Sequence, residues 1–99
     1  MKKNYITQIN NINGFEEPHA QMLKEIKAAE VVITNPINFV VALRYDVKKD
    51  YCPVLIAKGG LKLAFKIMEI AMQNYIPVIE SNSLTRELYA TLEVGDYIP

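Results

Sequence analysis

The sequence predicts an α/β domain with a small four-stranded mixed sheet, about four surrounding helices and one β-α-β unit. Two patterns indicate this class. Short segments dominated by β-branched and other apolar residues are typical of strands, and there are four of them: 31–34, 39–45, 52–57 and 77–80. Longer segments repeat apolar residues at helical spacing: 18–29, 61–75 and 84–92. A chain of 99 residues, 51% of them hydrophobic, suits one compact domain.

The chain begins with a segment that has no clear apolar period. Residues 1–17 are rich in asparagine, so we expect a flexible tail there, with a partner-docking segment as the alternative. The folded domain should then occupy residues 18–99. Pro18 suits the first turn of a helix, where its missing N–H costs nothing, and Leu23 and Ile26 fall on one apolar face of 18–29.

Two strands flank an Asn-Pro pair in the longest uncharged run of the chain. Pro36 cannot donate to a β-ladder, so Asn35-Pro36-Ile37-Asn38 should form a tight loop between strands 31–34 and 39–45. The charged residues 46–50 should then turn the chain into the third strand, which is apolar enough to be buried on both faces.

The second half of the chain predicts the β-α-β unit. Strand 52–57, helix 61–75 and strand 77–80 follow one another, and we expect the two strands to be parallel with a right-handed crossover. Asn82 or Ser83 should cap a last helix that ends before Gly95. We expect the buried core to include Val32, Ile33, Val41, Leu43, Leu55, Ile56, Leu61, Ala64, Ile67, Met68, Ala71 and Ile79.

Composition excludes several classes of function. Eleven basic and eleven acidic side chains cancel, which argues against a nucleic-acid partner, and no segment approaches the ~20 apolar residues of a spanning helix. His19 is the only histidine and has no second ligand at metal spacing, so we expect no metal site. Gly59-Gly60 lacks the rest of a phosphate-loop pattern, so an ordinary strand-to-helix turn is the favoured interpretation and no cofactor is expected.

A resemblance to a known family runs through most of the chain. Residues 17–99 resemble the cytoplasmic domain of the FlhB and YscU family of type III export-switch proteins. The family motif at the Asn-Pro loop reads Asn-Pro-Thr-His, and the family cuts itself between Asn and Pro. The resemblance rests on these segments: Val31–Pro36, Phe39–Asp46, Pro53–Gly59, Ile67–Ala71, Ile76–Glu80, Leu84–Tyr89 and Glu93–Pro99.

The resemblance implies a protein-binding component of the flagellar or virulence export apparatus. The implied partners are the export-gate cytoplasmic domain, export substrates and their chaperones, and the length-control protein. The implied location is cytoplasmic, peripheral to the inner face of the membrane without insertion into it. Lys48, Arg86 and Tyr89 are the candidate partner-binding residues, on a surface expected beside the Asn35-Pro36 loop and the last helix. A regulatory decoy that binds export partners without supporting export is the alternative, and a nucleotide-binding domain is a rival of another class.

The sequence departs from the family motif at two positions. Ile37 and Asn38 stand where the family has Thr and His. Self-cleavage between Asn35 and Pro36 needs a proton acceptor, and an amide is not a base near neutral pH. We therefore expect no enzyme activity toward other molecules, and self-cleavage that is slow or absent.

Overall fold

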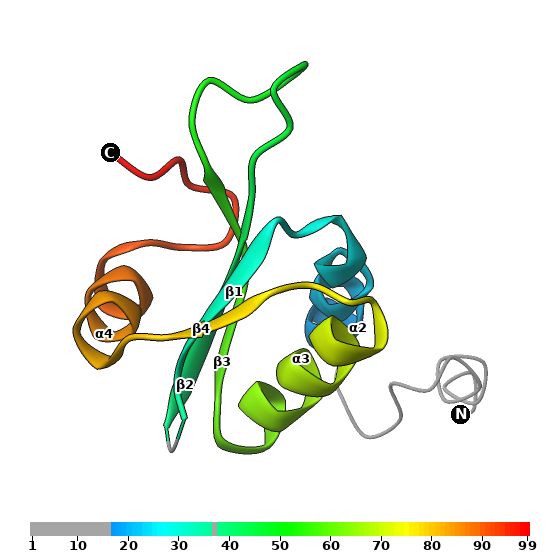
Figure 1. Ribbon diagram of the computed structural model, residues 1–99, viewed down its shortest axis with the longest axis vertical. Coiled ribbons are helices and arrows are strands. Elements are labelled where there is room, and N and C mark those ends of the chain that lie inside the picture. The colour runs from blue at the N-terminus through cyan, green and yellow to red at the C-terminus, as the bar shows by residue number, and fades with distance from the viewer. Residues whose placement is uncertain (1–16, 37) are drawn as a thin grey trace.

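A computed structural model describes residues 17–36 and 38–99, which form a sheet with helices on both faces (Figure 1). The predicted tail, residues 1–17, lies outside the described residues except for Glu17. The elements in chain order are α2 (Glu17–Lys24), the 3₁₀ turn η1 (Ile26–Ala28), β1 (Val31–Asn35), β2 (Phe39–Arg44), β3 (Val54–Gly60), α3 (Leu61–Gln73), β4 (Val78–Glu80) and α4 (Asn82–Thr91).

The four strands form one mixed sheet in the order β3-β2-β1-β4. β2 is antiparallel to both β1 and β3, whereas β4 is parallel to β1. β3 and β4 therefore run in the same direction, as the β-α-β prediction requires, but β2 and β1 lie between them. The predicted mixed four-stranded sheet is confirmed, and α3 carries the chain across two intervening strands.

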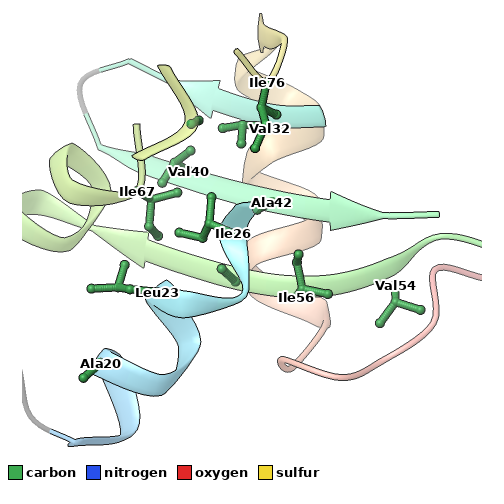
Figure 2. Close-up of a cluster of buried hydrophobic side chains, with 12 residues drawn as sticks. Ala20, Leu23, Ile26, Val32, Val40, Ala42, Val54, Ile56, Ile67 and Ile76 are labelled. Atoms are coloured by element: carbon green, nitrogen blue, oxygen red, sulfur yellow. The ribbon is translucent and has the colours of Figure 1, made fainter. Parts of the chain in front are cut away.

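One face of the sheet is covered by α2 and α3. Ala20, Leu23 and Ile26 from the first helical segment meet Val32, Val40 and Ile56 from the strands, as Figure 2 shows. Ile67 and Ala71 of α3 are fully buried in the same cluster. Because these side chains come from six elements, the cluster fixes both helices against the sheet.

α4 packs over β1 and β2 on the other face, and Leu92 and Ile98 from the segment after α4 join it there (Figure 1). The alternate residues of the strands point to this side, as the period of two along a strand requires. Its smaller cluster consists of Ile33, Val41, Leu43, Leu55, Leu88 and Leu92.

Most of the predicted core is buried, but two residues are not. Leu61 and Ile79 are 75% and 53% exposed, so the prediction that both lie in the core is wrong. Leu61 is the first residue of α3 and lies outside the helix face that meets the sheet. Ile79 lies on the edge strand β4, beyond the strands that α4 covers. Ala64 and Met68 are half-buried, and the other eight residues of the prediction are buried.

Each predicted helix differs from the prediction at one or both ends, and α3 stops at Gln73 instead of residue 75. The first helix ends at Lys24 rather than 29, and a 3₁₀ turn follows in which the Ala29 N–H donates to the Ile26 carbonyl at 2.8 Å. The last helix begins at Asn82, and its cap is Ser81 instead of Asn82 or Ser83. Ser81 has the extended backbone of a capping residue, and its Oγ accepts the Leu84 N–H at 3.4 Å.

The third strand is shifted toward the C-terminus relative to the prediction. It runs from Val54 to Gly60 instead of 52–57, because β2 pairs with it as far as Phe39 with Gly60. The β2 partner thus extends the strand through two glycines that a propensity argument assigns to a turn.

Candidate functional site

The Asn35-Pro36 loop is a tight turn between β1 and β2. Asn35 and Phe39 are paired across the two strands, and the Asn38 N–H donates to the Asn35 carbonyl oxygen at 3.0 Å. The Thr34 Oγ1 hydroxyl donates to the Phe39 carbonyl at 3.1 Å and ties the strand ends together. Ile37 lies outside the described residues. The turn therefore holds the Asn35–Pro36 peptide in a defined place.

The hydrogen bond to Asn35 bears on the chemistry of that peptide. The Asn35 carbonyl belongs to the bond that self-cleavage would break, and a donor on its oxygen stabilises charge that develops there. The side chain of Asn38 is exposed and offers an amide, which is not a base near neutral pH. His19 lies exposed on α2. The site thus retains a polarised carbonyl but has no histidine in the turn.

The start of α3 contacts this turn. The Leu61 N–H donates to the Asn38 carbonyl at 3.3 Å, and a Cβ on Gly60 would lie only 3.2 Å from the same oxygen. A Cβ on Gly59 would come within 2.6 Å of the Leu63 side chain. The two glycines thus allow close packing between β3, α3 and the turn. The predicted strand-to-helix turn at Gly59-Gly60 is wrong, because both glycines belong to β3 and pair with β2.

Leu61 adopts a backbone conformation that side chains rarely take. Its φ is +55°, in the left-handed region that costs a residue with a Cβ roughly 1–2 kcal/mol. This residue joins β3 to α3 with no intervening loop. Such strain tends to occur at functional sites, and here it lies next to the turn.

α4 is joined to the start of β2 by an aromatic pair. The rings of Phe39 and Tyr89 lie 4.5 Å apart at an angle of 34°. The Lys58 ammonium lies 4.9 Å from the Tyr89 ring centre and donates to the Tyr89 and Leu92 carbonyls at 3.0 and 2.8 Å. Lys58 therefore supplies the positive charge that the carbonyl end of a helix favours.

Sequence analysis missed Lys58, although a signal was present. A lysine that directly follows the apolar run Val54–Ala57 on a mostly buried strand must find partners for its charge. The partners lie 31 and 34 residues away in the chain, so only the fold could name them.

The predicted partner-binding residues do not form one surface. Arg86 is exposed on α4, and Tyr89 is half-buried in the contact with Phe39. Lys48 lies in the connection that follows β2, whereas the Asn35-Pro36 turn precedes β2 (Figure 1). The expectation of a single patch beside the turn is therefore wrong for Lys48, because the length of β2 separates the two ends.

An ion pair restrains the connection that carries Lys48. Arg44 donates from Nε and Nη2 to the two carboxylate oxygens of Asp50, both at 3.0 Å, and the Asp46 N–H donates to the same carboxylate at 2.8 Å. The Arg44 hydrogen bond, and after it the Asp46 N–H, lowers the pKa of Asp50, and the hydrogen bond with Asp50 raises the pKa of Arg44. This end of the sheet is therefore held by charge.

Most of the chain, the Asn35-Pro36 turn included, is similar to known proteins. Residues 14–99 match the model of the FlhB HrpN YscU SpaS family. The chain belongs to this family. The flagellar biosynthetic protein FlhB of Buchnera aphidicola subsp. Schizaphis graminum is 47% identical over 79 residues, which are 80% of this chain and 21% of that protein. The chain thus spans about a fifth of the length of this FlhB relative.

Solved structures of family members share the fold. The cytoplasmic domain of FlhB from Shewanella putrefaciens has a TM-score of 0.78 and 36% identity, covering 82% of this chain and 62% of that one. A mutated EscU C-terminal domain has a TM-score of 0.76 and 31% identity, covering 79% and 78%. EscU structures carry changes at an asparagine, at the proline after it and at a histidine two residues further on, the spacing of Asn35, Pro36 and Asn38.

None of the helices within residues 17–36 and 38–99 is long and apolar enough to cross a bilayer.

Proposed function

We propose that this chain is a protein-binding component of a type III export apparatus that recognises export substrates and takes part in switching between substrate classes. The observation that carries the proposal is the family match over residues 14–99, together with the fold of the FlhB cytoplasmic domain. The partners would be the export-gate cytoplasmic domain, export substrates with their chaperones, and the length-control protein, met at the cytoplasmic face of the membrane.

The partner surface would lie around the turn and α4. Asn38 and Arg86 are exposed, and the contact between the Phe39 and Tyr89 rings links the start of β2 to α4. Exposed arginine beside aromatic residues is typical of contact hot spots. Lys48 at the other end of β2 would then belong to a second contact or to none.

Complementation tests this function. The chain is expressed in a strain whose full-length FlhB lacks its cytoplasmic half, and motility and secreted hook and filament proteins are measured. Restored secretion supports the proposal. Binding of the export gate without secretion supports the alternative of a regulatory decoy. A chain that shows no binding and restores no secretion contradicts both hypotheses.

Point substitutions test the proposed surface. Arg86→Ala and Asn38→Ala should each weaken capture of the export-gate domain without changing the melting temperature, because both side chains are exposed. Thr91→Ala, on the same helix and also exposed, serves as the control. Equal capture by all three variants would contradict the placement of the surface.

We also propose that cleavage between Asn35 and Pro36 is slow or absent. The donor on the Asn35 carbonyl is present, but Asn38 replaces the family's histidine and cannot act as a base. General-base assistance typically contributes ~10²–10⁴-fold, so its loss alone could keep the chain intact for days.

Intact-mass measurement on fresh and aged protein tests the cleavage proposal. The unmodified chain should remain full length, and Asn38→His should accelerate the appearance of fragments that end at Asn35 and begin at Pro36. Asn38→His combined with Asn35→Ala is the control, since it keeps the imidazole and removes the attacking amide. Prompt cleavage of the unmodified chain would contradict the proposal.

A further inference from the structure

Residue 38 is held by one hydrogen bond on each side of its Cα atom. The Asn38 N–H donates to the Asn35 carbonyl at 3.0 Å, and the Asn38 carbonyl accepts the Leu61 N–H at 3.3 Å. The first bond lies within the turn, whereas the second comes from the first residue of α3. Because a residue has only two soft backbone dihedrals, these two bonds restrict the direction in which its Cα–Cβ bond points.

The ladder between β2 and β3 brings the start of α3 to this position. Gly60 pairs with Phe39, so the junction of β3 and α3 lies beside the residue that follows Asn38. A Cβ on Gly60 would lie 3.2 Å from the Asn38 carbonyl oxygen, which is a tight contact. A side chain at position 60 would therefore displace this carbonyl by a few tenths of an ångström.

The backbone of Leu61 is a second sign that the junction is constrained. Its φ is +55°, in a region that residues with a Cβ rarely adopt. The Leu61 side chain is 75% exposed, so its packing does not account for this conformation. With this conformation β3 passes into α3 without a loop while the Leu61 N–H reaches the Asn38 carbonyl. Backbone strain of this kind persists mainly where the surrounding structure enforces it, often at functional sites.

Position 38 corresponds to the histidine of the family motif. A general base must lie within hydrogen-bond reach of the proton that it removes, and a misplacement of about 1 Å can cost ~10²-fold in rate. The direction of the side chain at position 38 therefore decides whether a base there can serve the Asn35 amide.

We propose that the Gly60-Leu61 junction positions the side chain at residue 38, and so any base placed there. Leu61 acts through its main-chain N–H, and Gly60 acts through the space that it leaves for the Asn38 carbonyl. The inference rests on the proposed role of the missing histidine in cleavage. It gives the start of α3 a part in a reaction whose bond lies in the turn between β1 and β2.

Intact-mass measurement on Asn38→His variants tests the positioning. Gly60→Ala added to Asn38→His should slow the appearance of fragments by about three- to tenfold, because the carbonyl of residue 38 must shift. Leu61→Gly added to Asn38→His is the matched control. It keeps the N–H and suits a positive φ, so the rate should stay within about twofold. The pH dependence of the rate should be the same in all three proteins, since the imidazole is moved without a change in its basicity.

Amide hydrogen exchange tests the two hydrogen bonds without any cleavage. In the unmodified chain the N–H groups of Asn38 and Leu61 should exchange at least about tenfold more slowly than in an unstructured peptide, and Gly60→Ala should speed the exchange at Leu61.

The two measurements separate this inference from the proposed cause of slow cleavage. If Asn38→His does not cleave, that cause is contradicted and the exchange at Asn38 and Leu61 alone decides the positioning, as it does if Gly60→Ala fails to fold. A Leu61 N–H that exchanges like an unstructured amide overturns the inference. Cleavage that a folded Gly60→Ala variant leaves unchanged, or that Leu61→Gly slows equally, also overturns it.

Discussion

The two faces of the sheet are held by different forces. α2 and α3 cover one face, in a cluster of buried apolar side chains from six elements that includes Leu23 and Ile67. α4 covers the other face with a smaller cluster, and Lys58 and the Phe39–Tyr89 pair add polar and aromatic contacts. The first face therefore depends on burial, whereas the position of α4 also depends on a charge that single substitutions can remove.

The largest effect is expected at the α3 face. Ile67 of α3 is fully buried in the cluster against the sheet, so Ile67→Ala should lower the free energy of unfolding by about 2–5 kcal/mol. Chemical denaturation measures this change. Phe65→Ala on the exposed side of the same helix is the control and should lie within about 0.5 kcal/mol. Equal effects of the two substitutions would contradict the assignment of the buried side.

A smaller effect is expected at the α4 face. Lys58→Met keeps an unbranched side chain one atom shorter but leaves the Tyr89 and Leu92 carbonyls without their donor, which should cost about 1–3 kcal/mol. Hydrogen exchange should increase mainly in α4, because α2 and α3 keep their own cluster. An equal increase in α2 would show that the two faces are not independently held.

Backbone strain provides a third test. Leu61→Gly removes a Cβ from a residue with φ +55°, and Leu61 makes little contact with the core, so the free energy of unfolding should rise by up to about 1 kcal/mol. Thermal unfolding measures the gain. Leu84→Gly, within an exposed position of α4, should instead destabilise. A loss with Leu61→Gly would show that this side chain supports the fold.

Acid should destabilise the chain through the Arg44–Asp50 ion pair, which belongs to neither hydrophobic cluster. Arg44 lowers the pKa of Asp50 in the folded chain. The ionised Asp50 therefore contributes its full stabilisation above the pKa of the unfolded chain, about 4, and loses it as the pH falls through the lower pKa of the folded chain. The melting temperature should therefore decrease when the pH is lowered below about 4, and this decrease should be smaller in the Asp50→Asn variant. Identical pH profiles for the two proteins would exclude this ion pair as the cause.

Much of the fold follows from local pattern. The β-branched runs at 31–34 and 39–45 predict two strands, which the structure has at Val31–Asn35 and Phe39–Arg44. Pro36 between them predicts the turn, because proline cannot donate to a ladder. The apolar period of α3 predicts its buried residue Ile67 in the same way. The Asn35-Pro36 site is likewise visible in the sequence, since it consists of consecutive residues.

The sequence by itself determined the strands, the helices and the turn, since each depends on neighbours within a few residues. Only the tertiary structure decided which apolar residues of α3 are covered, that Lys58 serves the end of α4, and that Lys48 lies far from Asn38. These outcomes depend on the strand order. That of Lys58 also depends on hydrogen bonds to residues more than thirty positions away in the chain. Apolar residues that recur every three or four positions predict that a helix has an apolar side. Which of these residues are buried depends on how the helices and strands pack together.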